Sequence, residues 1–421
     1  MKNYLDIYLF IIIVTILILK IFYFNNQYIL HDELVNLTTY YYKETIFLKN
    51  FPNNHLYISF LGIIFEYIFG TNLLFLRLIN FLAFLLILYF ANRILKNKLK
   101  LYLIFLIFLI SDILFAYSFV LRGYYISSLL FVIIFFLILN LEEKRDFKNL
   151  NWIFLICCFQ ILNNISALYL VVPIISSILL NYKNLSIKNK IKSFKLYFLF
   201  PLIFFSSLQI FVTGLYIYKI YTINTSSLNF IFNNFFEFFR NSVNTIYFSS
   251  YTSSNLYENL NNLYNQIIIN PEIFLIIFLC IIISLVNIYK SKKSLINYIV
   301  IYFFIFFILI NKFPPTRVYL GFYYFFLIYL FYNINLNKFN YFYLNNFVIL
   351  LSLIVIMGIQ DTHRNFATIK DDQIKLEKKL ICKLKNKNFT EIEKHMYYYL
   401  FLERCNKRRN LNEFLNFYKS K

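Results

Sequence analysis

Long apolar stretches alternate with short polar ones along most of the chain. A helix needs about 20 apolar residues to cross the hydrocarbon core of a bilayer, and most of these stretches approach that length. Unbroken apolar runs are typical of helices rather than of the alternating strands of a barrel. The pattern therefore predicts an all-α, polytopic membrane helical bundle with about eleven spans. The predicted spans are residues 8–24, 73–92, 101–118, 124–141, 151–164, 167–182, 196–215, 272–289, 295–311, 317–333 and 341–359.

The segments between these spans predict further elements. No small-residue cleavage site follows the first stretch, so we interpret it as a retained signal anchor. The first outer loop, residues 25–72, contains the shorter stretch 56–69 with Glu66, which favours a helix lying along the interface. The loop 216–268 could carry short interfacial helices that cover a site, or it could be a solvated connector.

The chain is divided at about residue 360 by composition. Residues 1–360 form the predicted transmembrane domain, and residues 361–421 form a basic tail. Within the tail, Thr390 and Glu393 have the spacing of a capping box before the apolar run 396–402. The tail is therefore expected to be a small helical appendage.

Composition and charge agree with a membrane protein. The chain is 60% hydrophobic and 14% charged, which a soluble domain could not keep in water. The net charge of +21 would suit nucleic acid, but it is spread over short loops and the tail, so we expect no nucleic-acid partner. The positive-inside rule assigns to the cytoplasm the loops that hold Arg93, Lys96, Lys98, Lys100, Lys144, Arg145, Lys148, Lys183, Lys188, Lys190, Lys192, Lys195, Lys290, Lys292 and Lys293.

The opposite loops hold fewer cations, among them Lys43, Lys49, Arg122, Lys219, Arg240, Lys312 and Arg317. This asymmetry places the loop with His31, Asp32 and Glu33 outside the cytoplasm. An odd number of spans places the basic tail outside as well. The expected location is a bacterial inner or plasma membrane, with a site that faces outward.

The positions of the cysteines and glycines give no sign of a metal site or of a nucleotide-binding motif. The five cysteines show no metal-binding spacing. Cys157, Cys158 and Cys280 lie in apolar runs and are expected to be buried packing residues, whereas Cys382 and Cys405 could form a disulfide if the tail is extracytoplasmic. The six glycines are isolated, without a phosphate-binding loop or dinucleotide fingerprint. An activated substrate would therefore come from the membrane.

Three acidic residues are the candidates for catalysis. Asp32 and Glu33 follow the first span, and Asp112 is predicted near the outer end of a later span. Charged groups beside an apolar core are costly to desolvate, so they often mark functional sites. The alternative for the acidic pair is a solvated helix start, and for Asp112 a capped or snorkelling residue.

Basic and aromatic residues on the same predicted side are candidates for substrate binding. His55 and Arg77 flank the interfacial stretch, and Arg122 and Arg317 lie next to Tyr124 and Tyr319. Guanidinium groups bind phosphate in a bidentate manner and stay charged. Arginines that converge with acids on one membrane face favour chemistry on a phosphate-linked substrate. The alternative for either arginine alone is interfacial anchoring.

The order of these motifs resembles a known family. The series Asp32–Glu33, Asn54–His55–Leu56–Tyr57, Gly70 and Arg77–Leu78 resembles the first outer loop of the polytopic C-type glycosyltransferases, in the branch of the protein mannosyltransferases and aminoarabinose transferases. Arg122–Gly123–Tyr124 and Arg317–Val318–Tyr319 are similar to later elements of that family. The similarity covers residues 8–180 well and later spans loosely. One departure is His55–Leu56–Tyr57, where the family often has His-Pro-Pro.

The resemblance implies a membrane glycosyltransferase. Such an enzyme moves a sugar from a polyprenyl-phosphate donor to an acceptor hydroxyl on a lipid, glycan or protein, and inverts the anomeric centre. Asp32 matches the family's general base, and the arginines would stabilise the departing phosphate. Some relatives use a divalent metal, and nothing in this chain requires one.

Two other functions stay open from the sequence. A transporter or flippase for a lipid-linked sugar would have ionisable residues near mid-membrane, inverted repeats and broken helices, none of which is clear here. A noncatalytic subunit of envelope assembly is the third alternative.

Overall fold

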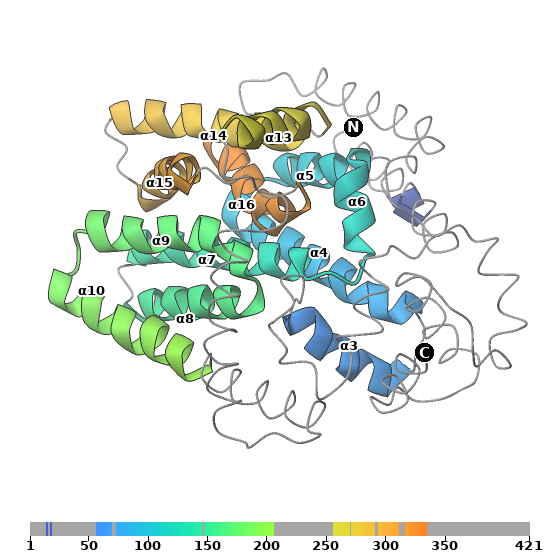
Figure 1. Ribbon diagram of the computed structural model, residues 1–421, viewed down its shortest axis with the longest axis horizontal. Coiled ribbons are helices and arrows are strands. Elements are labelled where there is room, and N and C mark those ends of the chain that lie inside the picture. Colours follow the sequence, from blue (N-terminus) through green and yellow to red (C-terminus); the bar gives the residue numbers. More distant parts are fainter. Residues whose placement is uncertain are drawn as a thin grey trace, which may run out of the picture.

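The part of the chain that the structure describes is almost entirely helical. The computed structural model describes residues 14–15, 17–18, 56–69, 73–144, 147–205, 256–269, 271–290, 294–310 and 316–334, and no strand occurs among them (Figure 1). The predicted span 341–359, the tail from residue 361, and Asp32, Glu33 and His55 lie outside these ranges. The α-helices are α3 (Leu56–Phe69), α4 (Leu73–Leu95), α5 (Lys98–Ile110), α6 (Asp112–Ser118), α7 (Tyr124–Lys144), α8 (Phe147–Asn163), α9 (Leu168–Asn181), α10 (Ile187–Phe194), α13 (Leu256–Ile269), α14 (Pro271–Tyr289), α15 (Leu295–Ile310) and α16 (Thr316–Asn333).

Three of the described helices are long and apolar enough to cross a membrane, judged by length and composition. They are Phe75–Leu95 in α4, Tyr124–Lys144 in α7 and Pro271–Tyr289 in α14. Shorter apolar helices include α9, α15 and most of α16. Helices of this length and composition are typical of a membrane protein.

Helices α7 and α16 form the centre of the described bundle. Helix α7 contacts α4, α8 and α16, and α16 also contacts α14, while α15 packs against α9 and α14 (Figure 1). Helices α16 and α7 approach each other at Gly321, where an added Cβ atom would lie 3.4 Å from the Ser127 hydroxyl oxygen. Small residues at such contacts bring membrane helices together. The centre of the bundle is therefore held by close packing around α7.

The predicted span 101–118 is two helices rather than one. Helix α5 ends at Ile110, α6 begins at Asp112, and Ser111 between them has extended backbone angles (φ −77°, ψ 113°). The Ser111 hydroxyl lies 3.4 Å from Oε1 of Glu272, at the start of α14. Ser111 and Asp112 are polar residues within this largely apolar stretch, and the break between the two helices falls at them.

The predicted basic loop 183–195 contains helix α10. The Ser186 hydroxyl caps it by accepting from the Asn189 amide at 3.4 Å. The helix runs on through the π-helical turn Lys195–Leu199 to residue 205. The wider turn precedes Pro201, which has no amide hydrogen to continue the α-helical pattern.

Two lysines counted as loop cations are buried instead. The Lys190 ammonium donates to the carbonyls of Leu179 (2.6 Å) and Tyr182 (3.0 Å), at the end of α9. The Lys100 ammonium donates to the carbonyl of Phe331, near the end of α16. The last carbonyls of a helix have no partner within it, so a lysine there supplies the missing hydrogen bonds. Loss of water lowers the pKa of both lysines.

The contacts of Lys100 and Lys190, together with three further hydrogen bonds, bring several helix ends close together. We call this end of the bundle, which includes the ends of α7, α9, α14 and α16 and the starts of α10 and α15, the basic end. Glu142, near the end of α7, accepts from the Ser294 hydroxyl (2.9 Å) and the Leu295 amide (2.5 Å) at the start of α15. Asn287 of α14 donates to Asn333 of α16 at 2.9 Å. The described loops that the sequence groups by their cations therefore lie at the same end, toward the left in Figure 1. The side of a membrane that this end faces stays a prediction.

The prediction for the three apolar-run cysteines is confirmed. Cys157, Cys158 and Cys280 are fully buried. The Cys280 thiol donates to the carbonyl of Phe326 at 3.2 Å, which links α14 to α16. These cysteines are packing residues of the bundle.

Candidate functional site

The candidate site lies at the end of the bundle opposite the basic end, where α4 begins and α6 leads into α7. Arg77 is on α4, and Arg122 is in the turn between α6 and α7. Asn80, one turn after Arg77, donates from Nδ2 to the carbonyl oxygens of Val120 and, at 2.7 Å, Arg122. These hydrogen bonds connect α4 to the turn before α7. Because Asn80 is one helical turn from Arg77, the backbones of Arg77 and Arg122 lie close together.

Both arginines are enclosed by protein. Arg77 and Arg122 are each 1% exposed. Buried guanidinium groups are costly unless they are paired and hydrogen-bonded, so they seldom serve packing alone. A phosphate would reach them only from inside the bundle or after neighbouring residues move.

Tyrosines connect this turn to α16. Tyr124, a predicted site residue, is buried and packs edge-on against Tyr117, with ring centroids 5.6 Å apart. The hydroxyl of the next residue, Tyr125, donates to the carbonyl of Leu114 and lies 3.3 Å from the Tyr324 hydroxyl. The start of α7 is thereby joined to both α6 and α16.

Glu272 is a candidate that the sequence analysis did not identify. It lies in the first turn of α14, and its carboxylate faces Ser111 across the break between α5 and α6. In sequence it looks like an ordinary acid at a helix start, placed after a proline. Only its contact with Ser111, far away in the sequence, distinguishes it.

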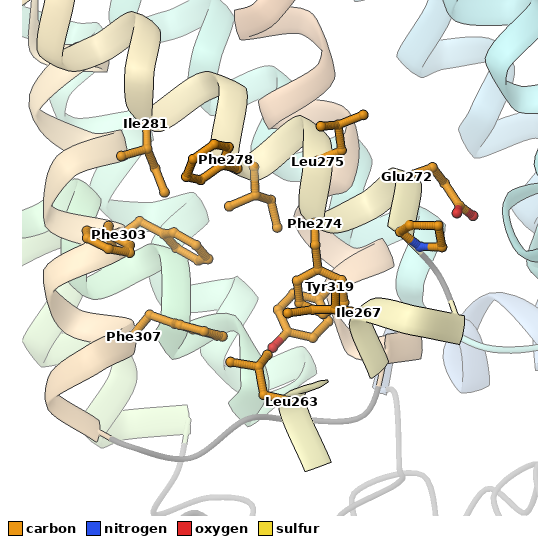
Figure 2. Close-up of a pocket in the computed structure, with 13 residues that line it drawn as sticks. Leu263, Ile267, Glu272, Phe274, Leu275, Phe278, Ile281, Phe303, Phe307 and Tyr319 are labelled. Carbon is orange, nitrogen blue, oxygen red and sulfur yellow. The ribbon is translucent and has the colours of Figure 1, made fainter. Parts of the chain in front are cut away.

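An apolar groove of about 700 Å³ begins beside Glu272. Helices α13, α14, α15 and α16 form its walls, and Figure 2 shows the aromatic rings of Phe278, Phe303 and Phe307 around it. Glu272 lies at one edge of the group, with its carboxylate away from these rings. The remaining apolar lining residues are Leu263, Ile267, Pro271, Phe274, Leu275, Ile277, Ile281 and Phe304.

Tyr319, the predicted site residue on α16, forms part of the groove wall. Its ring packs against Phe274 at 5.1 Å and Phe307 at 5.9 Å between centroids. Its hydroxyl is buried, and it has no hydrogen-bond partner in the described part of the chain. A buried hydroxyl without a partner costs about 1–3 kcal/mol, so it is a candidate to bind a ligand that enters the groove.

The groove also bears on the loop 216–268. Residues 256–269 of that loop form α13, and its Leu263 and Ile267 line the groove. This part of the loop is therefore helical and lines the groove, while the covering of a site by interfacial helices stays a prediction. Residues 216–255 lie outside the described residues.

The remaining predicted site residues are placed only in part. Asp112 begins α6 and Arg317 is the second residue of α16, but their side chains are not among those described. Asp32, Glu33 and His55 lie outside the described residues. Among the described side chains, no group of three or more His, Cys, Asp or Glu could hold a metal ion.

Comparison with known proteins does not assign the chain to a family. No family model, no curated protein and no solved structure matches it.

Proposed function

We propose that the protein is an integral-membrane glycosyltransferase that uses a polyprenyl-phosphate sugar. The observation that carries the proposal is that two chemically different regions, one with buried arginines and one apolar groove, lie at one end of the bundle. Buried arginines lie around the turn before α7, and an apolar groove opens beside Glu272 between α13 and α16. A lipid-linked sugar phosphate has the same two parts, a charged head and a long apolar chain.

The described contacts connect these two surfaces. The turn with Arg122 leads directly into Tyr125, which meets Tyr324 of α16. Glu272, at the edge of the groove, accepts from the Ser111 hydroxyl at 3.4 Å, and Ser111 directly precedes α6. We propose that a donor with its chain in the groove places its phosphate toward the turn that carries Arg122.

The proposed reaction needs a general base. Asp32 removes the proton from the acceptor hydroxyl, and the acceptor oxygen attacks the anomeric carbon. The bond from that carbon to the phosphate oxygen breaks, and polyprenyl phosphate leaves with the bonding electrons. Attack opposite the leaving group inverts the anomeric centre. Arg122 and Arg317 would stabilise charge on the departing phosphate, and Asp112 would orient the acceptor.

The proposal includes a membrane arrangement beyond the described helices. It has about eleven spans, an interfacial α3, and the site on the extracytoplasmic face of a bacterial inner membrane. The basic tail would form a small helical appendage on the same side.

A second candidate function is transport of a lipid-linked sugar across the membrane. The break between α5 and α6 favours it, because transporters often build their sites from interrupted helices. Here the break also carries an acid, Asp112, and contacts another, Glu272. Both functions would use the same amphiphilic substrate, and they differ in whether a bond is broken.

Sugar transfer in proteoliposomes distinguishes the two functions. The purified full chain is reconstituted with radiolabelled polyprenyl-phosphate sugars, with mannose and aminoarabinose donors tested separately. Label in a new acceptor supports the transferase, and label that crosses the membrane still attached to its lipid supports the transporter. If no donor gives either labelled acceptor or transported lipid, both proposed functions are contradicted.

The general base is tested in the same assay. Asp32→Asn keeps the shape of the side chain and removes its basicity, so we expect turnover to fall by about 10²-fold or more. Glu33→Gln is the matched control next to it and is expected to lose less. Turnover is compared only for variants whose melting temperature equals that of the wild type, so that a folding defect is not mistaken for lost catalysis. Turnover near wild type in Asp32→Asn would remove Asp32 from this role.

A further inference from the structure

The outward side of α10 and its continuation carries cations followed by exposed apolar side chains. Lys188, Lys192 and Lys195 are exposed and are spaced four and three residues apart. This spacing stacks side chains on one side of a helix, here over about 10 Å. Leu196, Phe200 and Ile203 come directly after them and are 52%, 67% and 64% exposed. We call these six residues the α10 face.

The α10 face is fixed in its orientation by Lys190. This lysine points into the protein and donates to carbonyls at the end of α9, the nearest at 2.6 Å. Phe194, one turn later, packs on Phe154 of α8 and Phe198, with centroids 5.6 and 5.0 Å apart. The inner side of α10 is thus held by a buried cation and by aromatic packing, so the lysines of the outer side remain exposed.

The lysines of the α10 face have no acidic partner in the part of the chain that the structure describes. Among the described residues, no acidic side chain forms an ion pair with Lys188, Lys192 or Lys195. Glu142, an acid at the same end of the bundle, is already bonded to Ser294 and Leu295 of α15. Among the described residues, these three lysines are therefore available to an anion from outside the chain.

We propose that the α10 face binds an anionic phospholipid. The phosphate group lies among the three lysines, and an acyl chain lies along Leu196, Phe200 and Ile203. The three lysines lie next to the three exposed apolar side chains along the helix. A phospholipid has the same arrangement, with a charged headgroup next to apolar chains, whereas a free anion has no apolar part. Basic residues at the end of a membrane helix attract anionic headgroups in this way.

The test measures thermal unfolding of the purified full chain in a neutral detergent. Dioleoyl phosphatidylglycerol is titrated, with dioleoyl phosphatidylcholine and glycerol phosphate as separate arms. A ligand that binds the folded state raises the melting temperature with increasing concentration. We expect phosphatidylglycerol to raise it at low concentration and the other two to have little effect.

Variants then locate the binding. Replacing Lys188, Lys192 and Lys195 together by Gln should weaken phosphatidylglycerol binding by about 100-fold, on the order expected for three lysines near a lipid surface. The matched control replaces three other exposed lysines of the basic end, Lys98, Lys144 and Lys290, by Gln. The control should bind nearly as well as the wild type. Replacing the first three lysines by Arg keeps the charge and should keep binding, which guards against a folding defect.

Several results would overturn the proposal. An equal effect of glycerol phosphate would mean a site for a free anion, and an equal effect of phosphatidylcholine would mean apolar binding without headgroup recognition. Equal losses in the two Gln variants would mean diffuse attraction to the whole basic end. Loss of binding in the Arg variant, with an unchanged melting temperature in the absence of lipid, would also contradict it.

Discussion

Lys188 and Lys190 stand two positions apart on α10 and have different surroundings. Lys188 is exposed, whereas Lys190 is 3% exposed and donates to carbonyls at the end of α9. In the sequence both belong to one run of cations. Positions two apart on a helix point in different directions, so one of them meets the protein and the other does not.

Lys190 should therefore be important for stability and Lys188 should not. Lys190→Met keeps the length of the side chain but leaves the carbonyls of Leu179 and Tyr182 without their donor. An unsatisfied buried acceptor costs about 1–3 kcal/mol, so the melting temperature should fall. Lys188→Met is the matched control, and it should melt like the wild type. The measurement is thermal unfolding in a neutral detergent without lipid, and equal melting of the two variants would contradict this role of Lys190.

Arg122 is proposed to bind the phosphate of the donor through its planar guanidinium group. Arg122→Lys keeps a positive charge but cannot reproduce the planar guanidinium, so we expect KM for the polyprenyl-phosphate donor to rise by about 10-fold or more. Arg93→Lys is the control, since Arg93 is an exposed arginine at the basic end that lies over the ring of Tyr89. Donor KM is measured on variants with equal melting temperatures. Normal KM in both Arg122→Lys and Arg317→Lys would exclude these residues from phosphate binding.

At the scale of elements, the contact of α7 with α16 organises the described bundle. It is a close approach at Gly321 and also includes the Tyr125–Tyr324 pair. The same residue of α7, Ser127, is also bonded to α8 by Gln160, which donates to the Ser127 carbonyl at 2.6 Å and accepts from its hydroxyl at 2.8 Å. Packing and interhelical hydrogen bonds are the interactions that join helices in lipid.

Substitutions at Gly321 test this contact. A Cβ atom would lie 3.4 Å from the Ser127 hydroxyl oxygen, which is ordinary contact, so Gly321→Ala should keep the wild-type melting temperature or exceed it slightly. Gly321→Leu adds atoms for which the interface has no room, and it should destabilise the protein by about 1–3 kcal/mol. Thermal unfolding compares the two. A Leu variant as stable as the Ala variant would show that α16 does not pack closely on α7.

At the scale of the whole molecule, the two ends of the bundle differ in character. The basic end has exposed lysines and polar contacts that cap helix ends, and the opposite end has the enclosed arginines and the groove. Cations retained on one side of a membrane set the orientation of a multi-pass protein. The proposed function requires that the basic end face the cytoplasm.

Cysteine labelling in intact cells tests this orientation. A cysteine at position 36 should react with a membrane-impermeant maleimide in intact cells, and a cysteine at position 188 should react only after permeabilisation. Position 188 is chosen because Lys188 is exposed, whereas a cysteine at the buried position 190 would be protected on either side. The background chain lacks Cys382 and Cys405, while Cys157, Cys158 and Cys280 are buried. Labelling of position 188 from outside would contradict the orientation and the mechanism that depends on it.

The sequence by itself determined the helical class, the approximate ends of most described helices, and the burial of Cys157, Cys158 and Cys280. These properties depend on the length and composition of local segments, because an apolar stretch of sufficient length is helical in lipid wherever its neighbours lie. The sequence also identified Arg77, Arg122, Tyr124 and Tyr319 as candidates, although their roles stay predictions.

Only the tertiary structure decided which residues face one another. The break at Ser111 is accompanied by a contact with Glu272, 161 positions away, and the cation of Lys190 belongs to the end of α9. The groove needs side chains from α13, α14, α15 and α16. Such features depend on contacts between distant segments and on the direction of single side chains, which local composition does not encode.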